Sequence, residues 1–293
     1  FKIRDFMSWT VSKLLLWSVA QWAKARIQLP RLDSEILLAH ALGCSREQIL
    51  INSDQTVEFN QIQKCCSLVE RRVLHEPLNY IIGEKEFWSL AFRVGPGVLI
   101  PRPETELLIE CLLSCKMPSN PLILDIGTGS GVIAIVSALE IPNSRIIAVD
   151  ISSSALKMAR YNATIHRVDH RINFLAGNIM DQNFCENLGR FDFILANPPY
   201  IPTGDLDALM ADVKDFEPFV ALDGGFDGLD FFRNIAPIAA QKLNSDGFLI
   251  MEIGDGQDQM VSKIVERQFS NAGILEDRSG QSRVIFVRKE ING

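Results

Sequence analysis

Positive charge is scarce in this 293-residue sequence, which carries 29 Lys and Arg against 36 Asp and Glu, for a net charge of −7. Broad affinity for nucleic acid needs clustered basic residues that neutralise phosphates. The balance therefore argues against a protein that wraps DNA or RNA over a wide surface. Residues 1–86 are nearly neutral, with 11 basic and 10 acidic residues, so the acidity belongs to the remainder of the chain.

Long hydrophobic runs are also missing. The most apolar N-terminal stretch, LLLWSVAQWA at 14–23, is too short to cross a bilayer and has no small-residue cleavage site of the signal-peptide kind. We therefore expect no membrane association. The expected location is the cytoplasm, or the matrix of an organelle if a leader has been removed.

The metal-binding patterns of cysteine and histidine are absent as well. None of the six cysteines forms a CxxC pair, and Cys111 and Cys115 lie one helical turn apart in an apolar run, as buried reduced thiols do. His166 and His170 share the i, i+4 spacing, but no HExxH motif and no third ligand accompany them. We expect no metal site.

The first quarter of the chain predicts a small helical bundle. Residues 6–75 have helical periodicity punctuated by Pro30 and by Gly43, which is a predicted helix C-cap. Ser45 and Gln48 have capping-box spacing, and Pro77 ends the last helical stretch. The bundle (domain 1–78) contains no catalytic constellation. It is either a structural cap or a module that recognises a macromolecule, and the sequence leaves both readings open.

The remainder predicts an α/β domain behind a short linker. Residues 79–103 contain brief aromatic and β-branched runs broken by glycine and proline, which predicts a β-hairpin linker. In domain 104–293, apolar runs at 122–126, 145–150, 172–176, 191–196, 247–253 and 283–288 alternate with helical segments. This alternation predicts a doubly wound, mostly parallel sheet covered by helices on both faces.

A glycine-rich turn follows the first predicted strand. In LILDIGTGSG, Gly127 and Gly129 allow a sharp turn and close approach to a ligand, and the helix beginning near Gly131 offers unpaired N–H groups. Asp150 ends the next strand, where a carboxylate can accept hydrogen bonds from both hydroxyls of a ribose. These residues predict a nucleoside-binding site at the carboxyl edge of the sheet.

The spacing of the turn excludes two common nucleotide motifs. The glycines stand at offsets 0, 2 and 4, whereas dinucleotide folds use 0, 2 and 5, and a P-loop would need GK[ST]. The pattern D-x-G-x-G-x-G, which begins at Asp125, resembles the first motif of S-adenosylmethionine (AdoMet)-dependent methyltransferases. The resemblance implies a cofactor site that includes Asp125, Gly127, Thr128, Gly129, Ser130, Gly131 and Asp150, with Asp125 near the methionine ammonium, directly or through water.

A second motif, NPPY, ends the strand at 191–196. Its two prolines stiffen the backbone and remove two donors. The Asn197 side-chain oxygen and the Pro198 carbonyl can accept both N–H protons of an NH₂ group and so orient a poorly nucleophilic nitrogen. The motif resembles the [DNS]-P-P-[YFW] signature of methyltransferases that act on planar nitrogens. Asn197 and Pro198 are the predicted catalytic residues, and with Pro199 and Tyr200, which can stack on a flat group, they form the predicted substrate site.

Three further stretches narrow the resemblance: 79–88, 98–110 (VLIPRPETELLIE) and 216–235 (FEPFVALDGGFDGLDFFRNI). Together with NPPY they look like the release-factor glutamine methyltransferases, the HemK/PrmC family. The resemblance implies a seven-stranded sheet and transfer of a methyl group from AdoMet to the glutamine amide of the Gly-Gly-Gln motif in peptide chain release factors. It also implies S-adenosylhomocysteine as product, N-terminal helices that contact the release factor, no direct contact with nucleic acid, and a monomer.

The sequence departs from the family pattern around the adenine. Where the family often has Asp followed by an aromatic residue, Asn178 and Ile179 stand, so they are the residues expected to border the adenine together with Asn197. From the linker side, Arg102, Thr105 and Glu106 could line the site, although Arg102 and Glu106 fit equally well in a surface turn that caps the following helix.

Two other functions fit part of the pattern. An adenine- or cytosine-amine methyltransferase acting on DNA or RNA shares the NPPY chemistry but requires a basic groove, which the charge disfavours. A non-catalytic AdoMet-fold binding module has no need of both Asp150 and NPPY. The acidic run at 203–217 is expected to be a solvated, mobile loop that could close over the ligands or contact a basic partner.

Overall fold

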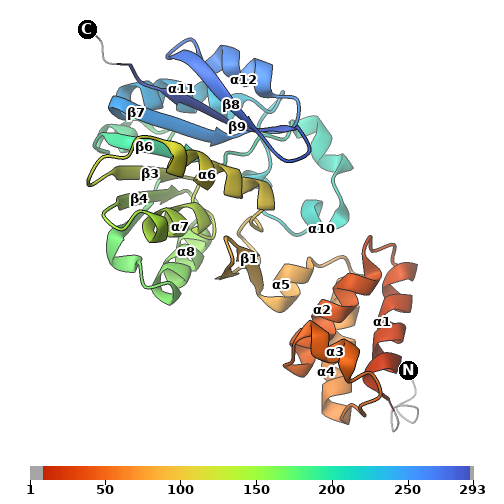
Figure 1. Cartoon of the computed structure of the whole chain (residues 1–293). Helices are drawn as coiled ribbons and strands as arrows, with labels where there is room; N and C mark the ends of the chain where they lie inside the picture. Colours follow the sequence, from red (N-terminus) through yellow and green to blue (C-terminus); the bar gives the residue numbers. More distant parts are fainter. Residues whose placement is uncertain (1–8, 291–293) are drawn as a thin grey trace. The chain divides into compact units, whose positions relative to one another are not determined.

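The computed structural model describes residues 9–290, which divide into two compact units (Figure 1). The helical unit contains the described residues up to Gly83 together with Met210–Phe216. The sheet unit contains Glu84–Leu209 and the residues from Glu217 onward. Within residues 9–290, no helix has the length and apolarity needed to cross a membrane.

The helical unit consists of α1 (Val11–Lys24), α2 (Pro30–Leu42), α3 (Arg46–Ile51), α4 (Phe59–Val73), α5 (Leu78–Ile82) and the later α10 (Ala211–Lys214). Its core is a cluster of fully buried side chains that includes Leu14, Trp22, Leu37, Leu38 and Cys65. Gly43 ends α2 with φ 68°, and the capping box of Ser45 and Gln48 is present, as predicted. The part of the predicted first helix at 6–8 lies outside the described residues.

The hairpin linker is shorter than predicted. Residues 78–82 form α5, because Pro77 provides an N-cap backbone and Gly83 ends the turn in the left-handed conformation with φ 80°. The hairpin itself pairs β1 (Glu84–Phe87) with β2 (Leu90–Arg93) around Trp88 and Ser89, both at positive φ as a two-residue hairpin turn requires.

A seven-stranded sheet forms the centre of the sheet unit, in the order β5-β4-β3-β6-β7-β9-β8. Its strands are β3 (Leu122–Ile126), β4 (Arg145–Asp150), β5 (Ile172–Ala176), β6 (Phe191–Ala196), β7 (Leu243–Glu252), β8 (Ser270–Glu276) and β9 (Ser282–Arg288). All neighbours pair in parallel except β9, which is antiparallel to both β7 and β8. The doubly wound, mostly parallel sheet is thus confirmed, and its strand order reverses between β3 and β6.

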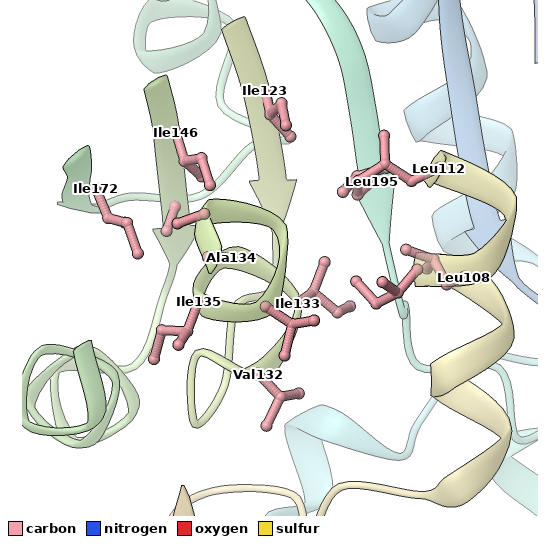
Figure 2. Close-up of a cluster of buried hydrophobic side chains, with 14 of the residues drawn as sticks. Leu108, Leu112, Ile123, Val132, Ile133, Ala134, Ile135, Ile146, Ile172 and Leu195 are labelled. Carbon is pink, nitrogen blue, oxygen red and sulfur yellow. The ribbon is translucent and has the colours of Figure 1, made fainter. Parts of the chain in front are cut away.

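Helices cover both faces of this sheet. The helices α6 (Glu106–Ser114), α7 (Val132–Glu140) and α8 (Ser153–Ile165) bury their apolar sides against one face, together with Phe87 and Phe92 of the hairpin. Figure 2 shows part of this buried cluster, with Leu108 and Leu112 on α6, Val132–Ile135 on α7, and Ile123 and Ile146 on the strands. The other face packs on α11 (Asp230–Lys242) and α12 (Asp258–Val265). Neighbouring residues of one strand, Ile123 and Leu124, belong to opposite layers, as strand geometry demands.

Candidate active site

The glycine turn lies at the carboxyl end of β3, beside the strand-order reversal where ligands bind in open α/β sheets. The N–H groups of Gly127 and Thr128 donate to the Val149 carbonyl of β4, at 2.8 and 3.1 Å. Gly127 and Gly129 have φ of 72° and 56°, and a Cβ added to either would meet no atom closer than 3.9 Å. The turn therefore leaves open space in front of its backbone, which a ligand can fill.

Asp150, predicted to bind a ribose beside the glycine turn, is hydrogen-bonded to that turn. Its Oδ2 accepts from the Gly129 N–H at 2.9 Å, and its Oδ1 accepts from the Ser152 N–H at 2.8 Å. These two bonds fix the carboxylate at the end of β4, and each oxygen retains a lone pair for a further donor.

Asp125 is fully buried in β3, and its carboxylate oxygens have no well-aligned hydrogen bond among the described residues, although the Thr128 hydroxyl and the Ala134 N–H lie near enough to favour its charged form. Burial raises the pKa of this carboxyl to about 7. A buried acceptor pair without partners is costly unless a donor arrives from elsewhere. This orphaned carboxylate fits the predicted place of an ammonium group or of a water molecule that bridges to one.

A cavity of about 220 Å³ opens in front of the glycine turn. Seven of the predicted site residues line it: Gly127, Gly129, Asp150, Asn178, Ile179, Asn197 and Pro199. The same wall includes residues that the sequence did not single out, among them Leu99, Val220 and Phe231. The cavity brings the glycine turn, the end of β4 and the NPPY segment together around one space.

The other predicted residues stand behind this wall. Asp125, Thr128, Ser130, Gly131, Pro198 and Tyr200 do not line the cavity. The Ser130 carbonyl accepts from Asn162 of α8, and Gly131 packs so closely on Ala159 that an added Cβ would lie 3.0 Å from its Cβ. These two residues fasten the turn to α8, while Gly127 and Gly129 line the cavity.

Asn178 and Ile179 border the cavity after the end of β5, and their place beside the adenine stays a prediction. The Asn178 Oδ1 already accepts from the Met180 N–H at 2.9 Å, which leaves one lone pair for a ligand donor. Ile179 is buried and contributes an aliphatic wall.

The NPPY segment begins a chain of hydrogen bonds among four polar side chains. Asn197 donates from Nδ2 to the Thr105 Oγ1 at 3.1 Å, and that hydroxyl donates to Glu252 Oε2 at 2.6 Å. The Tyr200 hydroxyl donates to the other oxygen, Glu252 Oε1, at 3.2 Å. The Tyr200 hydroxyl is therefore part of this network, and stacking of its ring on a flat substrate group stays a prediction.

Glu252 sits at the end of β7 and is buried, with 2% of its surface exposed. Burial raises the pKa of its carboxyl to about 7, against the lowering effect of the Thr105 and Tyr200 hydrogen bonds. Burial and the neighbouring Glu252 charge also raise the pKa of Tyr200 above its usual range, so the phenol remains a donor at neutral pH.

The backbone after NPPY is clamped by the 216–235 stretch. Ile201 donates to the Leu222 carbonyl and accepts from the Gly224 N–H, at 3.1 and 2.8 Å. Gln257 donates from Nε2 to the Tyr200 carbonyl at 2.9 Å. Gly228 has φ 75°, and an added Cβ would lie 2.4 Å from that same carbonyl oxygen. Only glycine permits this approach, which explains one of the glycines in the family-like stretch.

The linker residues have separate partners. Arg102 pairs with Glu217 at 2.6 Å, and the buried Glu217 also accepts from the Ile100 N–H at 3.1 Å. Thr105 contacts Asn197, as described above. Glu106 instead accepts from the Trp88 N–H at 2.7 Å and holds the hairpin, so it takes no part in the site.

The segment 203–217, predicted to be a solvated, mobile loop, is mostly exposed or half-buried, but two of its residues are buried and part of it packs in the helical unit. Glu217 is buried in its pairing with Arg102, and Leu206 of the 3₁₀ turn Thr203–Ala208 is buried too. Met210–Phe216 packs in the helical unit, where Asp212 lies 3.4 Å from Arg72. Paired carboxylates lose their preference for solvent, and a charge count along the sequence does not reveal such pairing.

Sequence reasoning missed three residues that support the site: Glu217, Glu252 and Gln257. Glu252 left a usable signal, because it is a lone carboxylate that ends the apolar run GFLIM at the carboxyl edge of the sheet. Glu217 and Gln257 act through contacts distant in sequence, and no local pattern marks them.

All six cysteines are free thiols. His166 contacts the Ala91 carbonyl of the hairpin at 2.9 Å. Within residues 9–290, no group of three His, Cys, Asp or Glu side chains is arranged to hold a metal ion.

Comparison with known proteins shows the fold and the family of this chain. Residues 13–83 match the PrmC N-terminal domain, and residues 103–212 match the methyltransferase small domain. A methyltransferase of Pyrococcus furiosus shares the fold, with a TM-score of 0.54 and 18% identity over 76% of this chain and 98% of that one.

Curated relatives match over almost the whole length. The release factor glutamine methyltransferase of Geobacter sulfurreducens is 41% identical over 96% of this chain and 97% of that protein. Those of Rhodopirellula baltica and Moorella thermoacetica are each 38% identical and cover at least 95% of this chain. The chain therefore belongs to the family of release factor glutamine methyltransferases.

Proposed function

We propose that this protein transfers a methyl group from AdoMet to the side-chain amide nitrogen of the glutamine in the Gly-Gly-Gln motif of a peptide chain release factor. The observation that carries the proposal is that Asn197, Gly129 and Asp150 line one cavity. That cavity joins a place for a nucleoside to an uncharged acceptor suited to an amide NH₂. Family membership supports the same substrate class.

The chain offers two acceptors for the two protons of the glutamine NH₂. Asn197 uses Nδ2 on Thr105, which leaves Oδ1 without a donor among residues 9–290. No described group donates to the Pro198 carbonyl either. Accepting both protons orients the nitrogen and stabilises positive charge that develops on it, and the prolines keep these acceptors from relaxing away.

The glycine side of the cavity has the groups that AdoMet requires. Asp150 would accept from the ribose hydroxyls, Asn178 and Ile179 would border the adenine, and Gly127 and Gly129 would admit the methionine part close to the backbone. Asp125 would offset the ammonium charge, directly or through water. When bound, AdoMet would supply an electrophilic methyl group: the C–S bond would break as the N–C bond formed, which would leave S-adenosylhomocysteine, and the nitrogen would lose one proton.

The remaining expectations about partners belong to this proposal. The helical unit would contact the body of the release factor, and the protein would act as a monomer in the compartment where translation ends, without binding nucleic acid directly. A net charge of −7 suits a protein substrate better than a polyanion.

Incubation with radiolabelled AdoMet tests the proposal. One reaction contains a Gly-Gly-Gln release factor, a second contains the same factor with Gly-Gly-Ala, and a third contains DNA and RNA. We expect label only in the first. Label in nucleic acid and none in the release factor would instead establish an amino-methyltransferase of nucleic acid.

A further inference from the structure

The hydrogen-bond chain behind Asn197 has only one consistent set of proton directions when Glu252 is ionised. A carboxylate can only accept, so both hydroxyls that reach it, those of Thr105 and Tyr200, must donate. The Thr105 hydroxyl has a single proton and spends it on Glu252. Toward Asn197 it can then only accept, and the Asn197 NH₂ must face it.

The opposite orientation of Asn197 would be destructive for catalysis. With its carboxamide turned over, Asn197 would present NH₂ to the cavity, so the substrate NH₂ would meet a donor there and keep one of its two acceptors, the Pro198 carbonyl. Such a site would prefer the carboxylate of a glutamate to the amide of a glutamine. The two orientations have nearly the same shape, so packing alone does not choose between them. The choice depends on what stands behind Asn197.

We propose that Glu252, acting through the Thr105 hydroxyl, is a positioning group that holds the Asn197 carboxamide with Oδ1 toward the substrate and so makes the site select glutamine over glutamate. The inference rests on the proposed function and deepens it. Glu252 and Thr105 do not line the cavity and touch no reacting atom, so their effect passes entirely through Asn197.

Burial of the hydrogen-bonded side chains explains why Glu252 and Thr105 strongly affect the orientation of Asn197. Thr105 and Glu252 are each about 2% exposed, so water cannot replace a missing partner. The second donor, Tyr200, keeps the carboxylate from being left with a single bond. Two charges act on Glu252 from other elements: Glu104 disfavours its ionised form and Arg283 of β9 favours it. When Glu252 gains a proton, it can donate to Thr105 and release that hydroxyl to turn toward Asn197 Oδ1.

The test compares Thr105→Val, which keeps the shape but removes the hydroxyl, with Thr105→Ser, which keeps the hydroxyl. For each protein, affinity is measured for a Gly-Gly-Gln and a Gly-Gly-Glu release factor in the presence of S-adenosylhomocysteine, and kcat is measured with the former. In Thr105→Val we expect the Gln-to-Glu affinity ratio to fall about 10- to 100-fold, the effect of one unmatched buried hydrogen-bonding group, with kcat falling as well. Thr105→Ser should restore both.

Glu252→Leu provides a second route, because it removes both acceptors with an apolar side chain of similar size. We expect it to lower the Gln-to-Glu ratio as Thr105→Val does, and the double variant to lower it no further, since both changes break one chain. Affinity for S-adenosylhomocysteine should stay within about threefold in all variants. A general loss of structure would weaken that affinity and both release factors alike.

The outcomes separate the inference from the proposed function. If the wild-type protein does not methylate the Gly-Gly-Gln factor, the proposed function fails. If the wild-type protein methylates it and either Thr105→Val or Glu252→Leu keeps the wild-type ratio, the function stands and the positioning role of Glu252 is refuted.

Discussion

Residues of the site differ in how many of their hydrogen-bonding groups already have partners within the protein before a ligand binds. Asp150 already accepts two backbone N–H bonds, so ribose hydroxyls would add to a carboxylate whose position is fixed. Asn197 has one end anchored and the other open to the cavity. This preorganisation spares the protein from reorienting these groups when the substrate arrives.

Replacement of Asn197 by alanine distinguishes a role in binding the substrate NH₂ from a role in binding AdoMet. Because Asn197→Ala removes the acceptor for the substrate NH₂, we expect kcat to fall at least about 100-fold. Asp150 and the glycine turn remain, so the AdoMet dissociation constant from calorimetry should change by less than about threefold. Asn234→Ala, at an exposed position on α11 whose side chain bonds only its own helix, is the matched control. Lost AdoMet binding would place Asn197 in the cofactor contacts instead.

The buried Asp125 predicts a pH-dependent stability. Burial raises its folded-state pKa from 3.8 to about 7, so the folded protein binds this proton more tightly than the unfolded chain does. The contribution is therefore fully present below about pH 4 and is lost as pH rises through about 7. Over that range the wild type should lose on the order of 3 kcal/mol relative to Asp125→Asn.

Urea unfolding at pH 4.5 and pH 8, without ligand, measures this difference. The exposed Asp169→Asn should give the same pH dependence as the wild type. Parallel curves for wild type and Asp125→Asn would show that the pKa of Asp125 is not raised.

At the scale of elements, the strands with one clear apolar run were predictable, and β3, β4, β5 and β6 have the predicted bounds. Strand β8 was missed from the residue pattern because its sequence, SNAGILE, is largely half-buried or exposed at the sheet edge and contains Asn271 at positive φ. Strand β7 begins at Leu243, four residues early, where its register with β6 is irregular. Edge position and register irregularity arise from tertiary pairing, which no local window contains.

In the site, too, local motifs could be predicted from the sequence and contacts between distant residues could not. The motifs identified Asn197, Gly127, Gly129 and Asp150, since each must have its residue type for a local reason. The Thr105–Glu252 chain joins positions 147 residues apart and could not be read from spacing.

The loop that clamps NPPY should be sensitive at Gly228. In Gly228→Ala the new methyl group would lie 2.4 Å from the Tyr200 carbonyl oxygen at a φ of 75°. We expect the free energy of unfolding to fall by about 2–3 kcal/mol, from positive-φ strain and overpacking, and methyl transfer to fall with the displaced NPPY backbone.

Gly204→Ala is the control for this loop, because nothing lies within 4 Å of its added Cβ. Urea unfolding and release-factor methylation are measured for both variants. Wild-type activity in Gly228→Ala would mean that the NPPY backbone does not depend on the clamp.

At the scale of the whole molecule, the chain enters the helical unit twice: first at its N-terminal helices and again at Met210–Phe216, ten residues after Tyr200. Arg72 of α4 is 7% exposed and lies 3.3 Å from Asp33 and 3.4 Å from Asp212. Arg72 also donates to the Glu76 carbonyl at 3.1 Å, and its pairing with Asp212 ties the returning segment to the bundle.

Hydrogen exchange tests this attachment. In Asp212→Asn the amides of α10 should exchange about 3- to 10-fold faster, the effect of losing roughly 1 kcal/mol from one partly buried ion pair. The amides of α7, in the sheet unit, should keep their wild-type rates. Asp215→Asn, for which the structure records no side-chain partner, is the matched control. Equal exchange in the two variants would remove the role given to Asp212.

The return of the chain at Met210–Phe216 bears on how such proteins can be recombined. A chimera joined at Gly83 would seem to exchange the whole bundle. It would, however, combine the new bundle with Met210–Phe216, seven residues that pack in the original bundle. Chimeras between relatives should therefore fold well only when the N-terminal helices and Met210–Phe216 are taken from the same parent protein. The sequence that must be exchanged to replace the bundle therefore consists of two separate segments, the N-terminal helices and Met210–Phe216.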